Sequence, residues 1–137
     1  MQRLNVGDTL AMCEAAHELA MGPAQSGTIV NVTVSPHHGM PAMAHTGRGP
    51  GRVEALTREL AQEWAGEGIA VVVLAVGRFA TESLRKYPAE LWRRAAETVP
   101  LQRLGEVREY GWTVALLALP AGTVALGLRG HDRRGAR

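Results

Sequence analysis

The sequence has little cysteine, few aromatic residues and no long apolar run. Each of these deficits excludes a class of protein. The single cysteine, Cys13, excludes an internal disulfide. No secretory leader pattern stands at the start, and together these features predict a reducing, cytoplasmic setting. The longest apolar run, "IAVVVLAV" at residues 69–76, is far shorter than the roughly 20 residues that span a bilayer. We therefore expect neither a disulfide scaffold nor a membrane partner.

Aromatic side chains make up 4% of the 137 residues, which leaves few platforms on which bases could stack. The formal net charge of +2 is a local excess, because many of the lysines and arginines stand between His45 and Val53 or after Leu126. Charge confined to two short stretches is weak support for a nucleic-acid partner, and we expect none.

Two apolar segments on either side of a helical pattern predict a parallel crossover. The segment "TIVNVTV", residues 28–34, is rich in β-branched residues and predicts a strand buried on both faces. Residues 69–76 predict a second strand, and residues 53–65 between them carry an apolar stripe at helical period. Strand, helix and strand in this order are typical of α/β folds.

Three further helical segments and a last strand complete the expected elements. Apolar spacing predicts a helix over residues 8–21 with Asp8 as its cap. Residues 81–100 predict a broken helical lid and residues 105–119 another helix. The segment "GTVALGL", residues 122–128, predicts a short last strand.

Several motifs stand in a familiar order: Asn5 before the first helix, "SGTIVNVTVS", "GMPAMAHTG", "VEALTRELAQEWAGEGIAV", "GRFATESL" and "VPLQRLGEVREYGWTVALLALPAG". Together they resemble the C-terminal half of the short-chain dehydrogenase/reductases. The stretch "NVTVSPHHGMPAMAHTG" is most similar to the branch of the 2,4-dienoyl-CoA and trans-2-enoyl-CoA reductases. The resemblance covers residues 1–122 and implies a truncated, doubly wound, Rossmann-like parallel sheet that lacks its N-terminal half. Residues 123–137 depart from the family, and we expect a divergent last strand and a partly disordered basic tail.

The resemblance implies an NAD(P)H-dependent oxidoreductase that acts on a small molecule or an acyl-CoA, with NADP or NAD as cofactor. The family's glycine-rich phosphate loop is not found in the sequence, so we expect this chain by itself to be weakly active or inactive. In the family, the helices at residues 8–21 and 53–65 pair with their counterparts, which implies a homo-oligomer. A non-catalytic fragment that associates through these helices is the alternative.

The family's catalytic tyrosine and lysine fall on Thr46 and Pro50 of this sequence. A threonine hydroxyl is far too weak an acid to replace tyrosine, and proline offers no side-chain donor. The glycines and proline of "GRGPGR", residues 47–52, lower helix propensity, so we expect the helix to begin only near Gly51 or Arg52. The stretch is either a flexible basic turn or an anion site built from its two arginines, Arg48 and Arg52.

The same stretch has a possible origin in the gene. The related branch commonly has Gly-Ala-Ala-Arg-Ala-Gly-Val at this place. One base inserted after the Gly47 codon and one deleted six codons later would convert that series to the Gly-Arg-Gly-Pro-Gly-Arg-Val of residues 47–53. We therefore hypothesise a compensated frameshift, which resequencing the gene through these codons tests.

Other candidate residues follow from spacing within the resemblance. Asn5 matches an asparagine that holds a water in the proton relay, or else it caps a helix. Thr33 lies thirteen residues before Thr46 and matches the family's catalytic serine, with Ser35 close by. A hydroxyl there would polarise the substrate oxygen, although a strand-end residue that bonds its own backbone is the alternative.

The turn "VGRFAT" matches the family's contact with the nicotinamide carboxamide. Its candidate cofactor residues are Gly77, Phe79 and Thr81, and a plain strand-to-helix turn is the alternative. Three histidines, His37, His38 and His45, stand close to one another in the sequence. They lack acidic or cysteine partners at ligand spacing, so we expect no metal site and interpret them as loop histidines that line a pocket.

Overall fold

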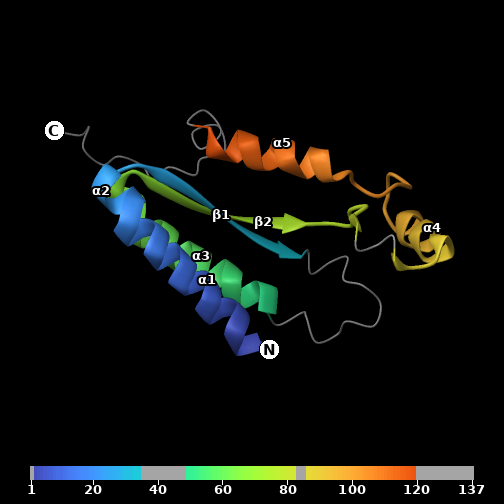
Figure 1. Ribbon diagram of the computed structural model, residues 1–137, viewed down its shortest axis with the longest axis horizontal. Coiled ribbons are helices and arrows are strands. Elements are labelled where there is room, and N and C mark those ends of the chain that lie inside the picture. Colours follow the sequence, from blue (N-terminus) through green and yellow to red (C-terminus); the bar gives the residue numbers. More distant parts are fainter. Residues whose placement is uncertain (1, 35–48, 83–85, 120–137) are drawn as a thin grey trace.

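A computed structural model describes residues 2–34, 49–82 and 86–119 of the chain. The described residues form a two-stranded parallel sheet with helices on both faces, and Figure 1 shows α1 and α3 on one face and α5 on the other. This is part of a doubly wound α/β fold, as the sequence predicts.

The strands are β1 (Gly27–Val34) and β2 (Ile69–Val76), joined by helix α3 (Gly49–Trp64) and a 3₁₀ turn at Ala65–Glu67. Their register runs from Gly27 opposite Ile69 to Val34 opposite Val76 without a slip. Both strands therefore end at the same level. The predicted crossover is confirmed, and Gly68, at φ +73°, ends the turn in the left-handed conformation that glycine adopts without strain.

Helix α3 begins earlier than its glycines and proline suggest. We expected the first helical residue near Gly51 or Arg52, and the helix begins at Gly49. Pro50 then falls in the first turn, where its missing N–H has no intrahelical partner to lose and its fixed φ suits the helix. The propensity cost applies to helix interiors, so the expectation was wrong for this position.

Helix α1 (Gln2–Ala16) also begins before the expected residue 8, so Asp8 lies inside the helix and does not cap it. A π-helical turn at His17–Met21 and a short helix α2 (Gly22–Ala24) continue it to the left-handed Gln25. The π turn places the His17 ring on the Trp64 ring, with centroids 4.4 Å apart, and its Nε2 2.7 Å from a Glu67 carboxylate oxygen. This cluster joins the end of α1 to the end of α3.

The core lies between α1, α3 and the sheet. Its buried members come from all three elements: Cys13, Leu60, Trp64, Ile69 and Val71. The other face of β1 is more open than predicted, because Val32 and Val34 are about half exposed. The expectation of a strand buried on both faces is therefore wrong for the end of β1, where the side chains that point away from α3 have less cover.

Beyond β2 the chain forms α4 (Ala89–Glu97) and α5 (Val107–Ala118). The helix expected within residues 105–119 is confirmed, and a reciprocal capping box between Glu106 and Glu109 begins it. In the part of the lid segment that the structure describes, the α-helix is α4, which starts directly after Pro88. The predicted strand at residues 122–128 lies outside the described residues.

Candidate active site

The carboxyl ends of β1 and β2 bring the central site candidates to one edge of the sheet. Thr33 lies opposite Ala75, two residues before Gly77. The Thr33 side chain is only 7% exposed, and its hydroxyl has no hydrogen-bond partner among the described residues. A buried hydroxyl without a partner costs free energy, so such groups in native proteins call for an explanation.

Asn31 lies two residues before Thr33, on the same face of β1. A series of polar contacts that begins at Asn31 sets the position of this part of the strand. The Asn31 amide nitrogen donates to the Thr57 hydroxyl at 2.9 Å, and that hydroxyl donates to the Val53 carbonyl at 2.7 Å. The Cys13 thiol lies 3.7 Å from the Asn31 amide oxygen, and burial raises the pKa of this thiol. Together these contacts fix β1 between α1 and the first turns of α3.

The roles of Asn31 and Thr57 were not predicted from the sequence. A signal was present in "TIVNVTV", where an asparagine interrupts a run of β-branched residues in a strand. A polar side chain in such a strand needs a partner, and here α3 supplies it.

The turn after β2 holds the three predicted cofactor residues in different surroundings. Gly77 is exposed, and a Cβ added there would meet nothing within 4 Å. Thr81 is exposed too, and its N–H donates to the Phe79 carbonyl at 3.0 Å. Phe79 instead packs inward: its ring meets the Tyr110 ring edge-on at 6.0 Å between centroids, and its backbone pairs with Gly105. Gly77 and Thr81 are thus exposed beside the strand ends, while the Phe79 ring anchors α5.

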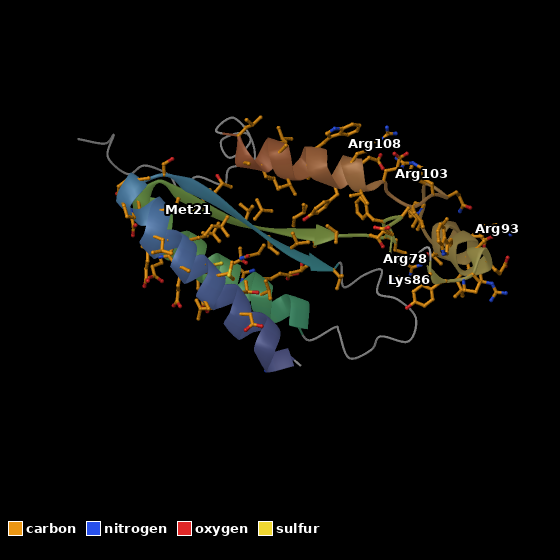
Figure 2. All side chains as sticks on the ribbon, in the orientation of Figure 1. Met21, Arg78, Lys86, Arg93, Arg103 and Arg108 are labelled. Atoms are coloured by element: carbon orange, nitrogen blue, oxygen red, sulfur yellow. The ribbon has the colours of Figure 1, made fainter. Side chains whose placement is uncertain are left out.

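The same turn is tied to α4 by Arg78. Its guanidinium donates to the Ala95 carbonyl at 3.3 Å and to the Thr98 hydroxyl, both at the C-terminal end of α4. A cation at this end of a helix also interacts favourably with the helix dipole. Figure 2 shows the Arg78 side chain where the turn after β2 meets α4, so the helix is held beside the strand ends.

The remaining site candidates divide by whether the structure describes them. Asn5 lies inside α1, so the alternative of a helix cap at its N-terminus is wrong, and its water-holding role stays a prediction. Arg52 is exposed on α3. The others lie outside the described residues: Ser35, His37, His38, His45, Thr46 and Arg48.

Within residues 2–34, 49–82 and 86–119, no group of three histidine, cysteine or acidic side chains could hold a metal ion. A shallow hollow between α3 and β2 is lined by Glu54, Thr57, Arg58 and the middle of β2. It lies away from the strand ends and is not the site assembled above.

Comparison with known proteins accounts for this arrangement. A family model described as enoyl-(acyl carrier protein) reductase matches residues 1–129. The chain belongs to the short-chain dehydrogenase/reductase family. The family match agrees with the partial Rossmann-like fold of the described residues and with oxidoreductase chemistry as the family's activity.

The curated relatives carry several different names. Galactitol 2-dehydrogenase (L-tagatose-forming) of Cereibacter sphaeroides is 40% identical over 105 residues, which are 74% of this chain and 38% of the relative. Peroxisomal 2,4-dienoyl-CoA reductase of Pongo abelii is 36% identical over 105 residues, covering 74% of this chain and 36% of that protein. A chloroplastic tropinone reductase homolog of Arabidopsis thaliana is 29% identical over 126 residues, with 90% and 39% covered.

The chain thus spans less than two-fifths of the length of these relatives. Because the relatives include peroxisomal and chloroplastic proteins, the cytoplasmic setting stays a prediction. In the described parts of the chain, no helix combines the length and apolar character that crossing a bilayer requires.

Proposed function

We propose that the chain supplies the substrate side of an NAD(P)H-dependent reductase whose substrate is an enoyl-CoA, a dienoyl-CoA or a related carbonyl compound. The observation that carries the proposal is the Thr33 hydroxyl, buried at the end of β1 without a partner. Its place on the strand matches the serine position of the family motif. The family match over residues 1–129 supports the reaction class.

The proposed chemistry assigns each residue a limited task. A reduced nicotinamide, when bound, supplies hydride to the substrate. The Thr33 hydroxyl, with Ser35 close by in sequence, donates a hydrogen bond to the substrate oxygen and stabilises the negative charge that develops there. In this largely desolvated position the hydrogen bond is stronger than it would be in water. Asn5 would hold a water for the proton supply, and Thr46 stands where the family has its acid.

The described residues fit the nicotinamide end of NADP or NAD better than they fit its pyrophosphate. Gly77 and Thr81 are exposed, and nothing lies within 4 Å of a Cβ added at Gly77, as a nicotinamide ring at the strand ends would need. For the pyrophosphate, a glycine turn leading into a helix N-terminus would be required. The only described glycine with positive φ, Gly68, instead follows the 3₁₀ turn after α3. We therefore propose nicotinamide contact through Gly77 and Thr81, with Phe79 holding the turn against α5, and weak overall affinity for the dinucleotide.

The choice of an acyl-CoA substrate rests on names among the relatives. Peroxisomal 2,4-dienoyl-CoA reductases occur at 36%, 34% and 31% identity. A galactitol dehydrogenase and a dihydroxydihydrocumate dehydrogenase match as well, at 40% and 31%. An assay should therefore include a polyol beside the thioester.

The test uses the full chain. Thermal unfolding is followed with NADPH and, separately, NADH up to millimolar concentration, because a ligand at one hundred times its Kd adds about 2.7 kcal/mol of stability. We expect a saturable rise in Tm with one of them. Slow oxidation of the cofactor should then depend on crotonyl-CoA and be lost in Thr33→Val. No shift with either dinucleotide would overturn the proposed function.

Association through the family helices is the second candidate, and the exposed surface of α1 and of the π-helical turn after it favours it. Met12 and Leu19 are 72% and 83% exposed and lie seven residues apart, close to one face of the helical segment. We propose that α1, beside α3, pairs with a second copy of the chain in a homo-oligomer. Size-exclusion chromatography with light scattering should give a dimer that Met12→Lys with Leu19→Lys converts to monomer. A monomeric wild type would contradict this candidate.

A further inference from the structure

The Thr57 hydroxyl, on α3, makes two hydrogen bonds whose directions are fixed by its partners. Its oxygen lies 2.7 Å from the Val53 carbonyl oxygen and 2.9 Å from the Asn31 amide nitrogen. A carbonyl oxygen can only accept and an amide N–H can only donate. The single hydroxyl proton of Thr57 is therefore committed to Val53, and the hydroxyl oxygen accepts from Asn31.

The same arrangement fixes the other end of the Asn31 amide. Because its nitrogen bonds to α3, its oxygen is left for α1, where the Cys13 thiol lies 3.7 Å away. A thiol is a weak donor, so the bond to Thr57 is the stronger of the two. Figure 1 shows α1 and α3 side by side on one face of the sheet, and the Asn31 side chain joins both to β1. Thr57 is thus the partner that decides where the amide is held.

Thr33 is the next residue of β1 on the face that carries Asn31. Side chains alternate along a strand, so the two point to the same side with their Cβ atoms about 7 Å apart. Rotation of both side chains about χ1 closes this gap to a hydrogen-bonding distance of about 3 Å. The Thr33 hydroxyl is buried and has no hydrogen-bond partner among the described residues. An Asn31 amide released from Thr57 would therefore find an unpaired acceptor beside it.

We propose that Thr57 is a positioning residue for the proposed reaction: by holding the Asn31 amide on α3, it keeps the Thr33 hydroxyl unpaired and free to bond the substrate oxygen. The inference deepens the proposed function and rests on it for the identity of the substrate. A hydroxyl held by Asn31 would have to leave that bond before it met a substrate carbonyl, and this loss would lower the affinity for the substrate. The unpaired state of Thr33 is then a consequence of the bond between Asn31 and Thr57.

The first test needs no ligand and uses urea unfolding of the full chain. In the wild type, Thr33→Val removes an unpaired hydroxyl and should raise the urea midpoint. In a Thr57→Val background the released Asn31 amide turns to Thr33, so adding Thr33→Val should lower the midpoint. A Thr57→Ser background keeps the hydroxyl and should give the same rise as the wild type. Residues that share a partner are expected to couple in this way. Thr33→Val shifts of equal sign and size in all three backgrounds would overturn the inference.

The second test measures crotonyl-CoA affinity by calorimetric titration without dinucleotide. Thr57→Val should lower the affinity roughly three- to tenfold, as expected for one neutral hydrogen bond. Adding Asn31→Val to Thr57→Val removes the released amide and should restore most of the affinity. A merely structural role predicts the reverse, because a second substitution in the core would weaken binding further.

Two control variants complete the titration. Thr57→Ser keeps the hydroxyl and should bind crotonyl-CoA as the wild type does. Leu56→Ala is the matched control for lost stability, because Leu56 is the neighbour of Thr57 on α3 and packs against the core. It should lower the urea midpoint and leave the affinity for crotonyl-CoA unchanged. Unaltered affinity in Thr57→Val, or still weaker binding by its double variant with Asn31→Val, would overturn the inference, as would a wild type that does not bind crotonyl-CoA.

These outcomes are distinct from the failure of the proposed reductase function. A chain that shows both the sign change and the restored affinity, but no Tm shift with NADPH or NADH, would retain the positioning role and lose the reductase proposal. A chain that oxidises NADPH with crotonyl-CoA equally well as wild type and as Thr57→Val would retain the reductase and lose the positioning role.

Discussion

Two buried threonines with opposite hydrogen-bond states allow a direct comparison. Thr33 is 7% exposed and its hydroxyl is unpartnered, whereas Thr57 is 3% exposed and its hydroxyl both donates to Val53 and accepts from Asn31. Valine has nearly the same shape as threonine and replaces the hydroxyl with a methyl group. Because the two side chains are similarly buried, the two Thr→Val variants differ chiefly in the hydrogen bonds that the removed hydroxyl made.

The two substitutions should change stability with opposite signs. Burying an unpaired hydroxyl costs about 1–3 kcal/mol, so Thr33→Val should raise the free energy of unfolding by about 1 kcal/mol, or raise Tm by about 4 °C. Thr57→Val leaves the Asn31 amide donor and the Val53 carbonyl without this partner and should lower the free energy of unfolding by about 1–3 kcal/mol. Thr and Val have similar propensities in helices and both favour strands, so propensity does not decide the sign.

Urea unfolding with a common m-value measures both changes. A loss of stability in Thr33→Val as large as that in Thr57→Val would refute the reasoning, because it would show that the Thr33 hydroxyl has a structural partner. A gain in stability together with a loss of crotonyl-CoA reduction is the expected pair of results. That pair would identify Thr33 as a residue whose hydroxyl serves the reaction at a cost to the fold.

Three further predictions address the surroundings of the site. Gly105→Ala places a Cβ 2.6 Å from the Phe79 ring, so it should lower the free energy of unfolding by about 1–3 kcal/mol; an unchanged urea midpoint would contradict the packing of the turn against α5. The Arg103 guanidinium lowers the pKa of Glu109 from 4.5 to about 2; the stability this pair adds is present above pH 4.5 and is lost as pH falls toward 2. In Glu109→Gln the urea midpoint should therefore change less between pH 5 and pH 3 than it does in the wild type. The same change of the midpoint with pH in both proteins would argue against the pair. Burial raises the pKa of the Cys13 thiol, so a disulfide reagent should modify it only in step with unfolding, and rapid reaction of the folded chain would show that the thiol is accessible.

The crossover could be predicted from sequence because its signals are local. An apolar β-branched run, a helical stripe and a second apolar run specify β1, α3 and β2 wherever the chain is placed. The predicted first residues of α3 and α1 were wrong, because general residue preferences did not hold at these helix ends. Pro50 is tolerated in the first turn of α3, and α1 extends to Gln2 without the cap that Asp8 was expected to provide.

The site could be predicted only in part, because its contacts join distant segments. Thr33 followed from its spacing within a resemblance. Nothing local reveals that Asn31 reaches Thr57, 26 residues away, or that Arg78 reaches the end of α4. Phe79 is the opposite case, because the motif predicts a cofactor residue. In the structure its ring packs against Tyr110 of α5.

The account depends most on one claim, that the carboxyl ends of β1 and β2 form the ligand-binding edge. Amide chemical shifts of the ¹⁵N-labelled chain during titration with NADPH and then crotonyl-CoA test it directly. We predict saturable changes at Thr33 and at residues 77–81, with few changes in the His17, Trp64 and Glu67 cluster. Changes confined to that cluster, or no saturable change at the strand ends at millimolar ligand, would contradict the account.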